Sequence, residues 1–292
     1  MSVLNRPLRS LLYMPGSRAR VLEKAKGLPA DGLIFDLEDA VAPDEKAAAR
    51  TTVAEALAAG GYGARLRLVR VNGLDTEWGA ADLDAAATMA CDAVLLPKVG
   101  APSELDAAAA RLDAAGGEGR ALWAMIETPQ GVLNAAAIAA HPRLEGFVLG
   151  TNDLLKDLGG RATQDRIALM PALAMALLAA RAHGVACIGG VYNAFRDLDG
   201  LAQECQQDRD MGFDGKTLIH PGQVEVANSA FAPDAAALDE ARRQIEAFDE
   251  AVASGSGVAV LDGKIVENLH VETARTLIAR AEAIAKSAAE TA

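Results

Sequence analysis

The chain is organised around the stretch Ala121-Leu122-Trp123-Ala124-Met125-Ile126-Glu127-Thr128-Pro129, an apolar run that ends in a carboxylate and a Thr-Pro pair. A second run of this kind, Gly146-Phe147-Val148-Leu149-Gly150-Thr151-Asn152-Asp153, follows shortly after it. Short apolar runs between turn residues are typical of parallel strands that are buried on both faces. We therefore predict two neighbouring strands that each place one acid, Glu127 or Asp153, at the carboxyl end.

Similar runs on both sides of this pair extend the pattern over most of the chain. Strands are predicted to start near residues 8, 31, 65, 92, 120, 145, 185 and 213, with helices between them. One of these helices is predicted to be capped by Ser17 and to run through about Lys26, and another to span about Asp165–His183. Eight strand–helix repeats, at intervals of about 23 to 40 residues, predict an α/β fold, a (β/α)8 TIM barrel, over residues 1–232. An open doubly wound sheet is the main alternative. It predicts fewer strands and a glycine-rich first turn, whereas the turn here reads Pro15-Gly16-Ser17-Arg18.

Residues 233–292 follow the predicted barrel as a separate pattern. They predict a helix over 233–253, a Gly-Ser turn, a hairpin of residues 258–261 and 264–266 around Asp262-Gly263, and a helix over about 271–288. Because the barrel is complete without them, we predict a C-terminal helix–hairpin–helix extension.

Composition excludes several classes of protein. The formal net charge of −12 argues against unspecific nucleic-acid binding, which depends on a basic surface. No apolar run reaches the roughly 18–20 residues of a membrane helix, and residues 1–9 have no signal-peptide pattern. The cysteines, Cys91, Cys187 and Cys205, are far apart and odd in number. We therefore expect a reduced, cytoplasmic protein without a membrane or nucleic-acid partner.

The predicted strand ends carry many charged side chains, and the active site of a barrel lies at these carboxyl ends. Acids that converge on one point repel each other unless a cation lies between them. Mg²⁺ commonly takes one or two protein carboxylates and keeps waters that a substrate can displace. Glu127 and Asp153 meet this requirement, so we predict that they hold Mg²⁺ or Mn²⁺. The alternative is that both are ordinary acids at helix N-termini, where the helix dipole favours them.

Four basic residues at or near the strand ends each have a functional and a structural interpretation. Arg70 offers a fork of donors that suits a carboxylate, but it could equally form an ion pair with Asp36 or Glu38. Lys98 ends a strand as Schiff-base lysines do, yet a carboxylate-rich site would keep it protonated. Arg18 and Lys24, on the first predicted helix, could hold a phosphate or lie on a solvated face.

Several motifs occur in order along the chain: Arg9-Ser10-Leu11-Leu12-Tyr13-Met14-Pro15-Gly16-Ser17-Arg18, Asp36-Leu37-Glu38-Asp39-Ala40-Val41, Arg70-Val71-Asn72, Leu96-Pro97-Lys98, Glu127-Thr128 and Gly215-Lys216-Thr217-Leu218-Ile219-His220-Pro221. Together they resemble the citrate lyase β-subunit and malyl-CoA lyase family of the HpcH/HpaI aldolase superfamily. The resemblance covers nearly the whole chain. It implies a Mg²⁺-dependent barrel enzyme that acts on 3-hydroxy-carboxyacyl-CoA thioesters and assembles as a homotrimer or hexamer.

The same resemblance assigns residues to roles. It implies that Glu127 and Asp153 are the metal ligands and that Arg70 binds the substrate carboxylate. The implied contacts to the CoA ester are Tyr13, Arg18, Lys24, Asn152, Ile219 and His220. The family also offers an aspartate from its C-terminal segment, typically Gly-Lys-Met-Ile-Asp, to a neighbouring subunit as an acid or base. Here the segment reads Gly263-Lys264-Ile265-Val266-Glu267, so Glu267 replaces that aspartate, and residues 233–292 are expected to pack on the neighbour as a lid.

The leading expectation for the reaction is that of a carbon–carbon lyase. Such an enzyme cleaves a substrate such as malyl-CoA or citramalyl-CoA into a keto acid and an acyl-CoA, or condenses these two in the reverse direction. Glu127-Thr128-Pro129 and Glu267-Asn268-Leu269-His270 look more like the (3S)-malyl-CoA thioesterase branch, which predicts hydrolysis to malate and CoA instead. A non-catalytic subunit of a larger lyase complex, and a barrel enzyme for phosphorylated acids without CoA, remain further alternatives.

Overall fold

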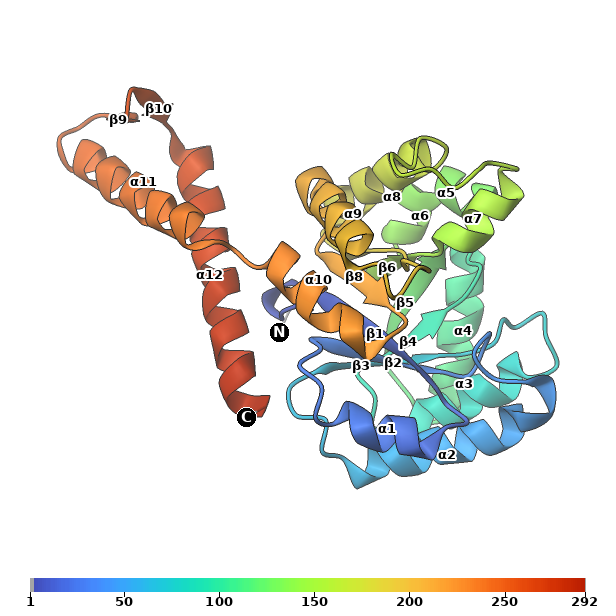
Figure 1. Cartoon of the computed structure of the whole chain (residues 1–292). Helices are drawn as coiled ribbons and strands as arrows, with labels where there is room; N and C mark the ends of the chain where they lie inside the picture. Colours follow the sequence, from blue (N-terminus) through green and yellow to red (C-terminus); the bar gives the residue numbers. More distant parts are fainter. Residues whose placement is uncertain (1–2, 292) are drawn as a thin grey trace. The chain divides into compact units, whose positions relative to one another are not determined.

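The computed structural model describes residues 3–291 and contains a closed barrel of parallel strands in sequence order (Figure 1). The predicted TIM barrel is therefore confirmed. Its strands are β1 (Ser10–Pro15), β2 (Gly32–Asp36), β3 (Leu66–Arg70), β4 (Ala93–Leu96), β5 (Ala121–Ile126), β6 (Leu144–Leu149), β7 (Ala186–Gly189) and β8 (Gly215–Leu218).

Helices follow the strands and cover the outside of the barrel (Figure 1). They are α1 (Ala19–Ala25), α2 (Lys46–Ala59), α3 (Gly79–Thr88), α4 (Pro102–Ala114), α5 (Pro129–Leu133), α6 (Ala135–Ala139), α7 (Thr151–Asp157), α8 (Met170–His183), α9 (Leu198–Met211) and α10 (Val224–Phe231). The strands read as continuous apolar runs because the helices bury one of their faces and the barrel interior buries the other.

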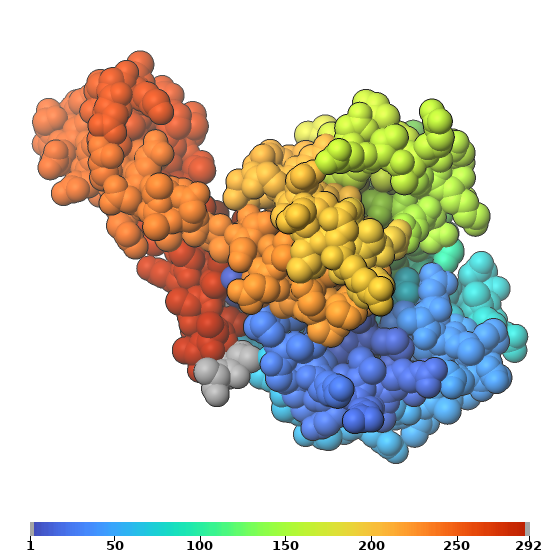
Figure 2. Space-filling view, in the orientation of Figure 1, coloured from blue at the N-terminus to red at the C-terminus, as the bar shows by residue number. Residues whose placement is uncertain are grey.

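The barrel closes where its last strand pairs with its first. Ser10 lies opposite Lys216 in the register of β1 and β8. The Ser10 hydroxyl donates to Asn228 Oδ1 at 2.7 Å, and Asn228 on α10 donates to the Pro29 carbonyl at the same distance. The orange segment after β8 accordingly lies against the blue segments at the start of the barrel in Figure 2. Side-chain hydrogen bonds thus tie the two ends of the barrel together.

Trp123 on β5 fills a large part of the core and is fully buried. A Cβ added at Gly146 on β6 would lie 2.6 Å from the Trp123 ring, so only glycine fits beside it. The pairing of β5 and β6 shifts register between Leu122 and Trp123. The stretch that predicts the fold therefore also fixes how these two neighbouring strands pack.

Two helix starts differ from the sequence-based prediction. The helix expected from residue 165 begins at Met170, because Arg166 adopts a left-handed conformation (φ 51°) and turns its guanidinium to Asp208 at 2.6 Å. Ser17, expected to cap the first helix, lies one residue before the actual N-cap, Arg18, which makes no side-chain capping bond. Long-range contacts and local backbone geometry outweigh the helix signals at both places.

Residues 3–7 and 232–290 form a second compact unit. It contains α11 (Ala235–Ala253), the hairpin strands β9 (Ala259–Leu261) and β10 (Lys264–Val266), and α12 (Asn268–Thr291). The hairpin turns at Asp262-Gly263, where both residues have positive φ, and its Ala259 and Val266 pack with Val271. None of the helices within residues 3–291 has the length and apolar character needed to span a membrane.

Candidate active site

A cavity of about 310 Å³ opens at the carboxyl ends of the barrel strands. Its lining includes Tyr13, Asp36, Asp39, Arg70, Met125, Glu127, Asn152, Asp153 and Ile219. A larger cavity, about 920 Å³, adjoins it and shares Thr151, Asn152, Val191 and Asn193 with it, but neither carboxylate of the predicted metal pair lines it. We therefore place the candidate active site in the smaller cavity.

Glu127 is held tightly at the edge of this cavity. It directly follows β5, and Thr128 begins α5 by accepting a hydrogen bond from the Gly131 amide, with Pro129 at the first helical position. The Glu127 side chain is buried (1% exposed), and its Oε1 accepts the Lys98 amide at 2.7 Å. On its other side, a Cβ added at Gly150 would lie 2.3 Å from Glu127 Oε2. The carboxylate is therefore clamped between the Lys98 amide and Gly150.

Burial raises the pKa of Glu127 to about 7, and the nearby charge of Glu38 adds to this increase. A carboxylate with such a pKa gains stability when a cation replaces the proton. Asp153, in the first turn of α7, lines the same cavity and is partly exposed. Within residues 3–291 no group of three His, Cys, Asp or Glu side chains is arranged to hold a metal, so this two-carboxylate pair is the candidate donor set.

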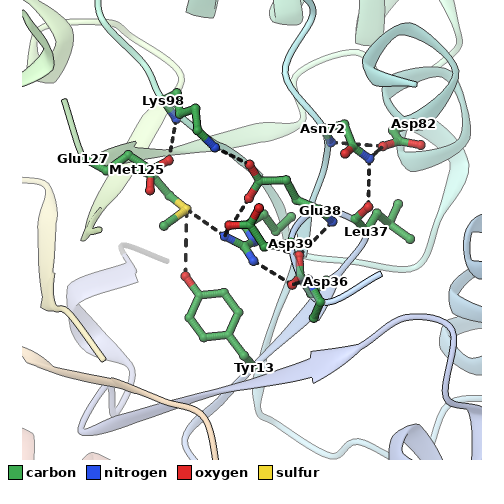
Figure 3. A network of polar contacts seen from close by, with 12 residues as sticks. Tyr13, Asp36, Leu37, Glu38, Asp39, Asn72, Asp82, Lys98, Met125 and Glu127 are labelled. Atoms are coloured by element: carbon green, nitrogen blue, oxygen red, sulfur yellow. Dashed lines mark hydrogen bonds and ion pairs between the residues drawn. The ribbon is translucent and has the colours of Figure 1, made fainter. Parts of the chain in front are cut away.

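Asp36 and Glu38, labelled in Figure 3 at the end of β2, balance the charge of Arg70. Its Nε and Nη2 donate to the two oxygens of Asp36 at 2.7 and 2.6 Å, and Nη1 lies 2.7 Å from Glu38 Oε2. Its guanidinium also stacks 4.8 Å from the centre of the Tyr13 ring. Burial opposes the charge, but Asp36 outweighs it and raises the pKa of Arg70. Arg70 therefore forms the internal ion pair that was the alternative to substrate binding, and it also lines the cavity.

The loop after β2 is held by a buried lysine whose role the sequence does not reveal. Lys46 Nζ donates to the carbonyls of Leu37 and Glu38 and to Asn72 Oδ1, at 2.8 to 3.0 Å. Asn72 in turn donates to the Leu37 carbonyl (Figure 3). Although Asn72 lies just after the end of β3, its side chain serves to fix this loop. A lysine among alanines on a predicted helix gives no signal of such burial.

Lys98 contacts both Glu127 and Glu38. Its amide binds Glu127, while its Nζ lies 2.6 Å from Glu38 Oε1, and its backbone has a positive φ of 52°. Partial burial disfavours its charge, but the hydrogen bond and charge of Glu38 outweigh this and raise the pKa of Lys98. A protonated lysine is not the nucleophile that a Schiff base requires.

The other predicted site residues are not all found in the cavity. Tyr13, Asn152 and Ile219 line the same cavity as Arg70 and the acid pair, and Asn152 exchanges side-chain hydrogen bonds with Asn193 at 2.7 and 3.3 Å. His220 instead caps the turn of residues 221–223 by accepting the Gly222 amide, and it stacks on Phe195.

Arg18 and Lys24 are exposed on or next to α1 and do not line the cavity. Glu267 belongs to the second unit, where it precedes α12 and its amide donates to His270 Nδ1.

Fold and site together define a class: a TIM-barrel protein with a small cavity of paired carboxylates and a charged arginine at the carboxyl ends of its strands. The model of the HpcH/HpaI aldolase/citrate lyase family matches residues 9–221, and the chain belongs to this family. The predicted resemblance is confirmed.

Individual relatives match over nearly the whole chain. A (3S)-malyl-CoA thioesterase of Cereibacter sphaeroides (strain KD131 / KCTC 12085) is 60% identical over 279 residues, which covers 96% of each chain. The citrate lyase subunit beta of Escherichia coli (strain K12) is 37% identical over 95% of this chain and 94% of its own. Among solved structures, CitE from Mycobacterium tuberculosis in complex with magnesium, acetoacetate and coenzyme A superposes with a TM-score of 0.77, at 31% identity over 94% of this chain and 97% of that chain.

Proposed function

We propose that this chain is a metal-dependent thioesterase that hydrolyses (3S)-malyl-CoA to malate and CoA. The observation that carries the proposal is the 60% identity to a (3S)-malyl-CoA thioesterase over 96% of both chains. The expectation of a carbon–carbon lyase is not confirmed, because the relatives of that name in this comparison are more distant, at 37% identity. The alternative reaction of the sequence analysis, hydrolysis, is therefore the better supported one.

Glu127 and Asp153 are the proposed ligands of Mg²⁺, with Mn²⁺ as a substitute. Two carboxylates on one cavity supply hard oxygen donors, and the raised pKa of Glu127 indicates a site in which a cation would relieve the cost of burying a charge. When bound, Mg²⁺ would polarise and orient the hydroxyl and carboxylate oxygens of the malyl group. Magnesium in the CitE complex supports this assignment.

Arg70 is the proposed holder of the malyl carboxylate. Its pKa is raised, its guanidinium lines the cavity, and Asp36 fixes its orientation with two hydrogen bonds. Tyr13 supports the guanidinium by stacking on it. The CoA part of the substrate is proposed to contact Tyr13, Asn152, Ile219 and His220 near the cavity, and its phosphates Arg18 and Lys24.

The proposed general base for hydrolysis is Glu267 of a neighbouring subunit in a homotrimer or hexamer. Its carboxylate would take a proton from water as the water oxygen bonds to the thioester carbonyl carbon; the C–S bond then breaks, and the CoA sulfur takes the proton. Glu267 lies on the hairpin unit, whose Val260 and Ile265 expose apolar side chains (70% and 63% exposed) that suit contact with another chain.

A lyase that cleaves malyl-CoA to glyoxylate and acetyl-CoA is the second candidate, and the citrate lyase subunit beta relative favours it. One time course separates the two: the purified chain is given malyl-CoA and Mg²⁺, and glyoxylate, free thiol and malate are each measured. Hydrolysis predicts equal amounts of free thiol and malate without glyoxylate. Glyoxylate with no free thiol would identify a lyase, and no turnover by the isolated chain would support a non-catalytic subunit.

A further inference from the structure

The nitrogens of the Arg70 guanidinium are bound unequally by the acids around them. Asp36 accepts two aligned hydrogen bonds from Nε and Nη2 and also binds the amides of Glu38 and Ala40, so both of its oxygens are fully used. Among residues 3–291, the remaining nitrogen, Nη1, makes a hydrogen bond only to the weak acceptor Met125 Sδ, at 3.6 Å. Nη1, which makes no bond to Asp36, is therefore the Arg70 nitrogen with the most donor capacity left for a ligand.

Glu38 forms an ion pair with Nη1 of Arg70 but makes no aligned hydrogen bond to it. Its Oε2 lies 2.7 Å from Nη1, yet the pair lacks hydrogen-bond alignment, and this buried oxygen has no hydrogen-bond partner among the described residues. The other oxygen, Oε1, accepts an aligned hydrogen bond from Lys98 Nζ at 2.6 Å. Glu38 is thus shared by two cations and is bound better by Lys98 than by Arg70.

Lys98 is placed to keep Glu38 when the contact with Arg70 is lost. Its side chain is about half exposed (49%) and is not part of the cavity lining, so it remains available when the cavity fills. The backbone of the loop stays in place, because Lys46 binds the Leu37 and Glu38 carbonyls and Asp36 binds the Glu38 amide. Only the Glu38 side chain needs to move.

We propose that Glu38 is an internal competitor for Arg70, which the substrate carboxylate displaces, and that Lys98 is the positioning residue that holds the displaced Glu38. The inference rests on the proposed role of Arg70 as the carboxylate binder. Glu38 balances the buried charge of Arg70 in the empty site. A neutral ligand cannot replace it, so the exchange favours ligands that carry a carboxylate.

Competition predicts opposite effects of two substitutions on one quantity, the inhibition constant Ki of (S)-malate measured with saturating Mg²⁺. Glu38→Gln removes the competing charge and should lower Ki about 3- to 10-fold, within the usual range of coupling between contacting residues. Lys98→Met leaves Arg70 as the one cation paired with Glu38 in the described part of the chain, and it should raise Ki by a similar factor. Lys98→Met keeps the backbone amide that binds Glu127.

The decisive result is non-additivity. In the double variant Glu38→Gln/Lys98→Met, the Lys98 substitution has nothing left to act on, so Ki should equal that of Glu38→Gln alone. Lys98→Arg, which restores a cation, should bring Ki back toward the wild-type value. Glu38→Asp, a milder change for the case that Glu38→Gln does not fold, should lower Ki less. Asp44→Asn and Lys156→Met, at exposed positions, are the charge-matched controls and should leave Ki unchanged.

Two results would overturn the inference. If Ki rises in both Glu38→Gln and Glu38→Asp, Glu38 has a structural role. If Lys98→Met changes Ki by the same factor in the wild type and in Glu38→Gln, Lys98 does not act through Glu38. Failure of the proposed function looks different. If Arg70→Met binds malate as the wild type does, Arg70 is not the carboxylate binder at all. If Arg70→Met loses malate binding while the Glu38 and Lys98 effects stay additive, only the competition is wrong.

Discussion

Replacing Gly150 by alanine tests the clamp on Glu127 with a single added carbon. The backbone of Gly150 has φ −91°, which alanine adopts without strain. The added Cβ, however, would lie 2.3 Å from both the Cβ and Oε2 of Glu127, and ordinary contacts require roughly 3.4 Å or more. Glu127 must therefore move by about 1 Å, and a misplacement of that size near the reacting groups costs about 100-fold in rate.

We expect the Gly150→Ala enzyme to lose about 100-fold in kcat/KM for malyl-CoA and to need more Mg²⁺ for half-maximal activity, while unfolding stays cooperative. Overpacking at a tightly packed position lowers the free energy of unfolding by about 1–3 kcal/mol, which differential scanning calorimetry measures. Gly27→Ala is the control, because only the Lys24 carbonyl, at 3.9 Å, lies near its added Cβ. Wild-type kinetics for Gly150→Ala would show that Glu127 does not need this position.

Three further predictions concern the charge of the site and its subunit composition. A lysine in Arg70→Lys cannot reproduce the two hydrogen bonds to Asp36, and each lost charge-assisted bond is worth about 1.5–3 kcal/mol. We therefore expect kcat/KM to fall at least about 10- to 100-fold. Unchanged kinetics would show that Arg70 does not bind the substrate. Because the pKa of Glu127 is raised to about 7, Mg²⁺ must displace a proton when it binds below that pH. The affinity for Mg²⁺, measured by calorimetric titration, should therefore fall about tenfold per pH unit below pH 7 and level off above it. A Mg²⁺ affinity that does not change from pH 5 to 8 would contradict this. Mixing inactive Glu267→Gln and Asp153→Ala chains, with subunit exchange, should restore part of the activity if Glu267 acts in trans; no recovery despite proven exchange, or a fully active Glu267→Gln enzyme, would exclude that role.

The sequence predicts the barrel well because each strand is an apolar run whose end is marked by a polar residue. Glu127 and Asp153 could be placed on one cavity for the same reason, since the topology of a parallel barrel brings all strand ends together. The engagement of Arg70 by Asp36 was foreseen only as an alternative, because a fork of donors suits an internal acid as well as a substrate.

Other features depend on contacts that no local pattern encodes. The buried Lys46 and the left-handed backbones of Lys98 and Arg166 are set by partners far away in sequence, such as Asn72 and Asp208. His220 differs from these residues, because it caps its turn through a local capping box with Gln223, and it also stacks on Phe195. Residue type at a strand end thus predicts the chemistry available at the mouth of the barrel, but not which groups neutralise one another.

The most direct test of the central claim is the metal dependence of turnover in Glu127→Gln and Asp153→Asn chains. These substitutions keep the shape of each side chain and remove only its charge, so the fold should survive, as circular dichroism can verify. The account predicts that the wild-type chain releases free thiol from malyl-CoA only with Mg²⁺ or Mn²⁺, loses this activity in EDTA, and that neither variant recovers it at any metal concentration. Full activity of the wild type in EDTA, or of either variant with metal, would contradict it.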